Sequence, residues 1–211
     1  FHPEIECASR EQIREWQIER FLKTFSHVYD NVEYYCNRMK EKGVDEFFAA
    51  AKTIKAEFGE KVAFDVVGFY EDAYKETVDQ LVADGVIKFH GFQTDVHPFY
   101  EAADCVVLPS YHEGMSNVML EGAATGRALI TSDISGCREA VEDGVSGYLC
   151  PAQDAEALTN SFREFAGKTR NEQEQMGCCG RALIERKFDK RIVVAQTMNG
   201  LGLAEAARSK A

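Results

Sequence analysis

The stretch CVVLPSYHEGMSNVMLEGAA, residues 105–124, predicts a strand, a loop and the start of a helix. The apolar run at residues 105–108 is typical of a buried strand, and Pro109 and Ser110 break it. Asn117 is a favourable N-cap residue for the apolar-periodic segment at residues 118–124. A strand that leads through a loop into a helix is typical of parallel βαβ units.

The start of this helix is a candidate anion site. The amides of Ser116, Asn117 and Val118 have no expected partner within the helix and lie at the positive end of its dipole. A diphosphate can be stabilised there without a cation from the protein. We include Gly114 and Met115, in the loop before the helix, among the candidate binding residues.

Two carboxylates, Glu113 and Glu121, stand eight positions apart around this helix start. A carboxylate can accept both hydrogens of a vicinal diol in one charge-assisted clamp, so Glu121 is a candidate ligand for a ribose. Glu113, in the loop, would face whatever lies beyond the phosphates. The simpler alternatives are an ordinary helix-surface glutamate at 121 and, at 113, a charge that favours the helix dipole.

Strands and helices alternate along the whole chain. We predict strands at residues 32–36, 62–69, 86–89, 105–108, 128–131 and 147–150, with amphipathic helices between them. This pattern predicts a single α/β domain with a doubly wound parallel, Rossmann-like sheet. Ligands bind such sheets at the carboxyl ends of the strands, which is where Glu113 falls.

Composition limits the classes of partner and cofactor. The 211 residues carry a formal charge of −11, which argues against nucleic acid as a partner. No D-x-D triplet or His/Cys/Asp cluster has metal-ligand spacing, so we expect neither a metal nor another cofactor. The seven cysteines form no C-x-x-C pair, which favours free thiols in a reducing, cytoplasmic compartment.

The spacing of Glu113 and Glu121 and the sequence around it resemble the E-x7-E signature of the retaining glycosyltransferases of family 4, which have the GT-B architecture. The resemblance runs from about residue 40 to about residue 194. The blocks that carry it include Gly91-Phe92, Leu108-Pro109-Ser110, residues 134–139 and residues 142–147. The segments at 111–121 and 135–139 look most like bacterial enzymes that build capsule, O-antigen or exopolysaccharide.

The resemblance implies a role for each matched residue. Glu121 would bind the ribose, and Glu113 would contact the transferred sugar and orient it rather than attack it. The turns at Gly68, Gly91 and Phe92 would lie along the nucleotide crevice, with the base against the backbone near Phe92. Their alternative interpretation is two turn glycines and a core phenylalanine. The implied reaction is a metal-independent, retaining transfer of a hexose from a nucleoside-diphosphate sugar.

In the family an arginine and a lysine hold the donor phosphates. Lys42-Gly43 matches the end of that loop, but the alignment then places Asn37 at the arginine position and Arg38 one residue later. A shift of one residue tends to turn a side chain to the other side. We therefore predict a phosphate contact from Lys42 and treat Arg38 as a second candidate, the alternative for both being solvated charges in a Lys/Glu-rich turn.

The length corresponds to only the C-terminal, donor-binding half of a GT-B enzyme. We divide the chain into a helical segment or linker at residues 1–30, a Rossmann-like domain at 31–188 and a C-terminal helix at 189–211. A saccharide or lipid-linked saccharide acceptor would bind a missing N-terminal domain. The apolar stripe of the first segment predicts burial against the domain, a missing domain or a second copy of the chain.

Two other functions stay open at this point. A GT-B sugar-nucleotide epimerase would bind similar donors, and a non-catalytic nucleotide-binding or interaction domain would explain the departure at Asn37. We expect a cytoplasmic protein, with peripheral membrane association as an option for the full-length form. Isolated, the chain should bind donor and transfer poorly.

Overall fold

A computed structural model describes residues 38–69 and 71–200. The chain divides into two units at Arg38, and the second unit, which begins at Met39, contains nearly all of the described residues. The predicted helical segment at residues 1–30, the predicted strand at 32–36 and residues 201–211 lie outside the described part.

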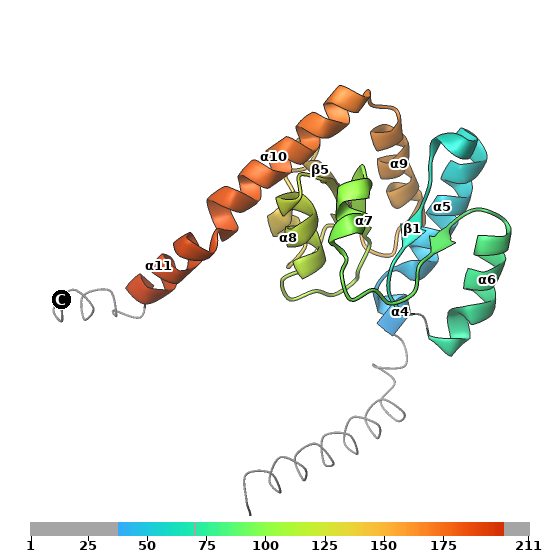
Figure 1. The fold of residues 1–211 in the computed structure, drawn as a ribbon, viewed down its shortest axis with the longest axis horizontal. Coiled ribbons are helices and arrows are strands. Elements are labelled where there is room, and N and C mark those ends of the chain that lie inside the picture. Colours follow the sequence, from blue (N-terminus) through green and yellow to red (C-terminus); the bar gives the residue numbers. More distant parts are fainter. Residues whose placement is uncertain (1–37, 70, 201–211) are drawn as a thin grey trace, which may run out of the picture. The chain divides into compact units, whose positions relative to one another are not determined.

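Helices and strands alternate as predicted (Figure 1). Short 3-10 turns occupy Gly59–Lys61, Asp72–Tyr74 and Arg138–Ala140. The described strands are β1 Asp65–Val66, β2 Lys88–Phe89, β3 Cys105–Leu108, β4 Ala128–Ser132 and β5 Gly147–Cys150. The described helices are α4 Arg38–Glu41, α5 Val44–Phe58, α6 Lys75–Ala83, α7 His97–Ala102, α8 Asn117–Ala124, α9 Ala155–Ala166, α10 Arg170–Phe188 and α11 Lys190–Gly200.

The strand pairs are all parallel, as the βαβ pattern predicts. β3, β4 and β5 form one sheet in that order, with Val107 opposite Ile130 and Ile130 opposite Tyr148. β1 and β2 form a second sheet, in which Val66 is opposite Phe89. The fold class is therefore the predicted parallel α/β architecture.

We predicted one continuous sheet, but the described strands form two separate sheets. No backbone hydrogen bond between described residues joins β1 to β3, and a cavity of about 750 Å³ lies between their facing edges. Its lining includes Val66 on one side and Val107 on the other. The strand predicted at residues 62–69 is shorter than expected at both ends, and beyond its C-terminal end the backbone leaves the extended conformation at Gly68, where φ is +141°.

Helices cover both faces of the three-stranded sheet. All five residues of β4 are buried, and their side chains alternate between two cores. Ile130 packs with Ile54 of α5 and Phe162 of α9 on one face. Leu129 packs with Met119 of α8 and Ile184 of α10 on the other face. The apolar residues at 128–130 suit a central parallel strand that is buried on both sides, and the buried Thr131 satisfies its hydroxyl by donating to the carbonyl oxygen of Leu108.

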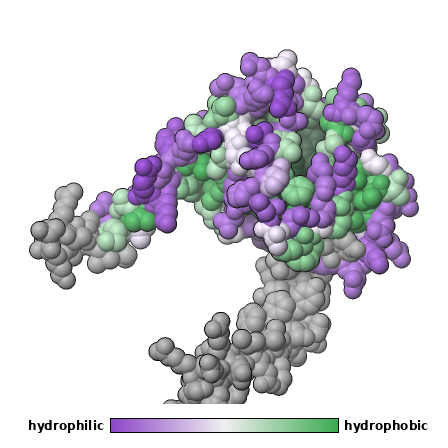
Figure 2. Space-filling model, in the orientation of Figure 1, coloured by the Kyte–Doolittle hydropathy of each residue, from purple (hydrophilic) through white to green (hydrophobic). Residues whose placement is uncertain are grey.

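α10 begins at a capping box, in which Thr169 and Glu172 exchange side-chain and backbone hydrogen bonds. One side of α10 packs against α8 and β4, and Figure 2 shows hydrophilic residues along its visible side. Within residues 38–69 and 71–200, no helix combines the length and apolar character that crossing a bilayer requires.

Candidate functional site

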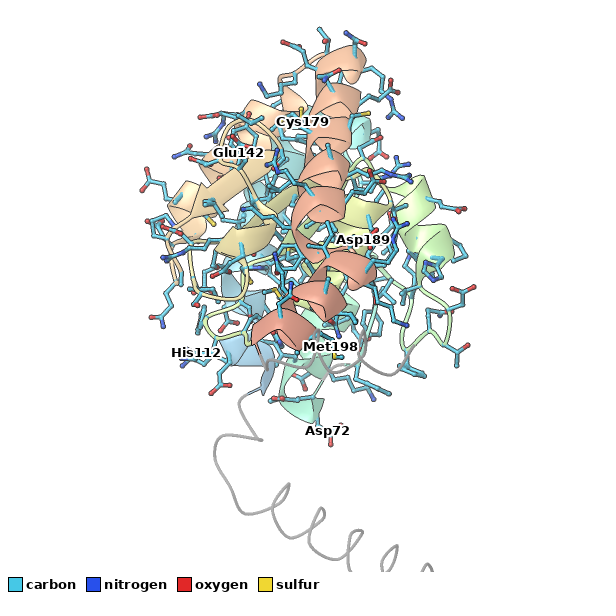
Figure 3. All side chains as sticks on the ribbon, turned by 90° about the vertical axis from the view of Figure 1, so that its left-hand side faces the viewer. Asp72, His112, Glu142, Cys179, Asp189 and Met198 are labelled. Carbon is cyan, nitrogen blue, oxygen red and sulfur yellow. The ribbon has the colours of Figure 1, made fainter. Side chains whose placement is uncertain are left out.

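The candidate residues gather where β3 ends. Because the strands are parallel, the loop after β3 and the loop before β5 lie at opposite ends of the sheet. Figure 3 shows this directly: the labelled His112, which follows β3, lies low on the domain near α4, and Glu142, which precedes β5, lies high. The site is therefore at the carboxyl edge, as predicted.

The helix start differs by one residue from the prediction. Ser116 is the N-cap, and its Oγ accepts a hydrogen bond from the amide of Met119 at 3.4 Å. Asn117, which we predicted as the cap, is the first residue of α8. Serine caps a helix about as well as asparagine does, and Ser116 is buried.

The amide of Ser116 is not a free donor, so this part of the anion-site prediction is wrong. It donates to the carbonyl oxygen of Gly136 at 2.9 Å. The amides of Asn117 and Val118 donate to no group in the part of the chain that the structure describes, and the same holds for Gly114 and Met115. The helix start thus keeps two free amides, and the preceding loop adds two more.

Gly136 fixes the loop that carries Glu113. At φ +90° it lies so close that a Cβ would be 2.0 Å from the carbonyl oxygen of Gly114 and 2.6 Å from that of Glu113. The carboxylate of Glu139 accepts the Gly136 amide at 2.7 Å and closes the turn. Sequence reasoning assigned this turn no chemistry. The sequence signal was a glycine followed three residues later by a glutamate.

Lys42 and Glu113 are brought together as an ion pair. Gly43, with φ +69°, has room for no side chain because Pro109 packs against it. The carbonyl oxygen of Glu41 accepts the amide of Tyr111 at 2.7 Å, so the end of α4 is fixed to the loop after β3. These backbone contacts place the Lys42 ammonium group at the carboxylate of Glu113.

The two partners differ in exposure. The side chain of Glu113 is 16% exposed and that of Lys42 is 41% exposed. The carboxylate is therefore largely removed from water, and the lysine remains accessible to a ligand.

Glu121 lies on an exposed position of α8 and accepts a hydrogen bond from the hydroxyl of Tyr100 at 3.1 Å. Burial, with a smaller contribution from this hydrogen bond, raises the pKa of Tyr100 to about 12. The phenol therefore keeps its proton at neutral pH and acts as the donor. Tyr100 is a site residue that sequence reasoning missed, because no local pattern relates it to a residue 21 positions away.

The turns at the ends of β1 and β2 are joined. The amide of Gly68 donates to the carbonyl oxygen of Gly91 at 2.9 Å. The rings of Phe69 and Phe92 stack beside them, 4.7 Å between centroids, and are 76% and 58% exposed. The alternative of a core phenylalanine at 92 is therefore wrong.

Arg38 is the first residue of α4, and its side chain is not among those that the structure describes. His112 is exposed. Among the described residues no three His, Cys, Asp or Glu side chains form a cluster that could hold a metal ion.

The assembled site pairs one accessible cation and unpartnered amides with two carboxylates. Cations and amides bind phosphates, and carboxylates bind hydroxyl groups. The arrangement is chemically suited to a ligand that contains both, such as a phosphorylated sugar or a nucleotide.

Comparison with known proteins agrees with this chemistry. A family model described as glycosyl transferases group 1 matches residues 30–167. An N-acetylgalactosaminyltransferase of Campylobacter jejuni, which acts on an undecaprenol-linked saccharide by name, is 30% identical over 57% of this chain and 31% of its own length. The capsular polysaccharide glycosyltransferase CapM of Staphylococcus aureus is 25% identical over 77% of this chain and 43% of its own. The chain thus spans under half of the length of these relatives.

Solved structures share the fold. HepE of Anabaena in complex with UDP superposes with a TM-score of 0.67 at 23% identity, over 77% of this chain and 46% of that one. The C-terminal domain of the glycosyl transferase LpcC of Francisella tularensis gives a TM-score of 0.62 at 24% identity, over 72% of this chain and 82% of that domain. The chain therefore shares the fold of that C-terminal domain.

Proposed function

We infer that this chain, which belongs to the glycosyl transferases group 1 family, binds a nucleoside-diphosphate sugar and is the donor-binding half of a retaining, metal-independent hexosyltransferase. The observation that carries the proposal is the Lys42–Glu113 ion pair beside the open start of α8. It places a cation, free amides and a carboxylate at the carboxyl edge of the sheet, where such folds bind nucleotides.

The diphosphate would bind at the start of α8. The amides of Asn117 and Val118 point along the positive end of the helix dipole, and Lys42 is accessible enough to turn from Glu113 toward an anion. Gly114 and Met115 would add loop amides, and Arg38 is a further candidate cation. These groups would neutralise the charge that develops on the leaving nucleoside diphosphate without a divalent ion.

The two carboxylates would hold the sugars at either end of the diphosphate. Glu121, fixed by Tyr100, would accept the hydroxyl hydrogens of the ribose. Glu113 would bind the transferred sugar once Lys42 moves to the phosphates. Its low exposure gives that carboxylate a defined orientation, which suits a residue that positions the sugar in a front-face transfer.

The nucleobase would lie toward the joined turns of Gly68, Gly91 and Phe92. HepE, a relative in fold, is described in complexes with UDP and with UDP-glucose, which makes uridine the first base to test. The acceptor would bind a further domain, since the chain spans under half of its relatives. Relatives named for capsule and colanic acid synthesis favour a bacterial surface polysaccharide as the product, made at the cytoplasmic side of the membrane.

The test is calorimetric titration of the chain with UDP, GDP and ADP in the presence of EDTA. We expect one nucleotide to bind, and Glu121→Ala to weaken it. Glu164→Ala is the matched control, because Glu164 is an exposed glutamate in the last turn of α9, away from the carboxyl edge. Binding that requires added Mg²⁺ would overturn metal independence, and no binding to any of the three by the folded chain would overturn donor binding.

A test of whether the transfer retains the anomeric configuration requires the full-length protein. The transferred sugar should keep the anomeric configuration that it has in the donor, as read by NMR of the product. An inverted product would contradict the proposed mechanism while leaving donor binding intact.

A further inference from the structure

Tyr100 is a buried residue whose hydroxyl contacts the exposed side chain of Glu121. It is 9% exposed and packs in the core cluster that also contains Met119 and Ala123 of α8. Its hydroxyl reaches out of this core to Oε2 of Glu121. Within the described part of the chain, no other group donates a hydrogen bond to that carboxylate.

α7, which carries Tyr100, is held on its other side as well. The ring of Phe99 contacts the ring of His90 with 4.9 Å between centroids. His90 in turn shares a 2.6 Å hydrogen bond with Asp65 of β1. The helix therefore connects the end of β2 with α8, and these contacts, together with the burial of its ring, hold Tyr100 in place.

The chemistry of the contact leaves Glu121 free to bind a second partner. Each carboxylate oxygen has two acceptor sites, so Oε2 keeps one and Oε1 keeps both. A long, exposed glutamate that must be ordered on binding loses rotamer freedom, and a bond already present in the free protein removes part of that cost.

We propose that Tyr100 is a positioning residue, which holds the Glu121 carboxylate in the orientation that accepts the two ribose hydroxyls. The inference rests on the proposed donor binding. It adds Tyr100 as a residue that determines the preference of the proposed donor site for a ribose. Tyr100 acts through Glu121 and touches no reacting atom.

The experiment is a double-mutant cycle on the full chain, with Tyr100→Phe, Glu121→Ala and the double variant, titrated with whichever nucleotide the wild type binds. Tyr100→Phe should weaken binding by about two- to ten-fold, the range expected for ordering one long side chain. In the Glu121→Ala background it should have no further effect. The loss should also shrink when the ligand is the 2′-deoxynucleotide, which offers the carboxylate one hydroxyl fewer.

Tyr148→Phe is the matched control. Tyr148 is also 9% exposed, lies in the other core cluster, and its hydroxyl has no hydrogen bond to a described residue. It should leave affinity unchanged, and thermal unfolding should show that all the variants fold.

Each outcome decides one question. If the wild type binds nucleotide and Glu121→Ala weakens it, but Tyr100→Phe binds as wild type does, this inference alone is wrong. Losses that multiply in the double variant would also overturn it, since Tyr100 would then act independently of Glu121. If the wild type binds no nucleotide, the proposed function fails first.

Discussion

The ammonium group of Lys42 contacts the carboxylate of Glu113 across 71 positions of sequence. Two backbone contacts create this pair: Gly43 packs against Pro109, and the carbonyl oxygen of Glu41 accepts the amide of Tyr111. The pair joins the start of α5 to the loop after β3. A ligand anion that draws Lys42 away would free Glu113 at the same moment, which would couple the two halves of the proposed donor site.

Replacement of Lys42 by methionine should weaken nucleoside-diphosphate binding by roughly ten- to a hundred-fold, as expected for one lost hydrogen bond to a charged group. The binding of a nucleoside should be unaffected, because a nucleoside carries no phosphate. Lys52→Met, at an exposed position of α5, is the control. Calorimetry with the diphosphate and the nucleoside checks both, and an equal loss for the two ligands would contradict a phosphate role.

Gly136→Ala should disturb the Glu113 loop. The new Cβ would lie 2.0 Å from the carbonyl oxygen of Gly114, so the loop has to move. Gly144→Ala is a matched control, because Gly144 has a similar positive φ of +72° but open space around its Cβ position. Both should lose about 1–3 kcal/mol of stability from the strained backbone. Only Gly136→Ala should also lose nucleotide affinity, and equal affinities for the two variants would show that the loop does not position Glu113.

Two glycines of α10 should respond in opposite directions to alanine. A Cβ at Gly177 would lie 1.9 Å from the carbonyl oxygen of Gly126, whereas at Gly180 the nearest atom is 3.6 Å away. Gly177→Ala should therefore destabilise the fold by about 1–3 kcal/mol through overpacking. Gly180→Ala should stabilise it by up to about 1 kcal/mol through helix propensity. Chemical denaturation measures both, and a neutral Gly177→Ala would mean that α10 does not pack closely on the turn before β4.

Alkaline pH should titrate three tyrosines late, namely Tyr74, Tyr100 and Tyr111, because burial raises the pKa of each. Burial, together with hydrogen bonds to Asp45 and Glu121 respectively, raises the pKa of Tyr74 and of Tyr100 to about 12. Because the folded pKa exceeds the unfolded value of about 10, this contribution to stability is complete below pH 10 and is lost as the pH rises toward 12. The absorbance of tyrosinate in the folded protein should show that these tyrosines ionise at higher pH than the others. Tyr100→Phe should reduce the number of late-ionising tyrosines by one. If Tyr100→Phe left the number of late-ionising tyrosines unchanged, Tyr100 would not be one of them.

The sequence by itself determined the class of fold and the position of the candidate residues at the end of β3. The apolar run at residues 128–130 of β4 can be satisfied only between two layers of helices, and the strand that ends at Leu108 leads directly to Glu113. These are local signals, since a period of two or of 3.6 residues and a proline break are read within one segment. For the same reason Glu113, Glu121 and the free amides of Asn117 and Val118 could be predicted from the sequence.

Only the tertiary structure decided what these residues contact. The tie from Gly136 to Ser116, the pair of Lys42 with Glu113 and the bond from Tyr100 to Glu121 each join separate segments. Such contacts depend on strand order and on close backbone approach at Gly43 and Gly136, where a missing side chain leaves room. The positive φ of Gly68, which ends the extended backbone after β1, is likewise absent from the apolar pattern of the sequence.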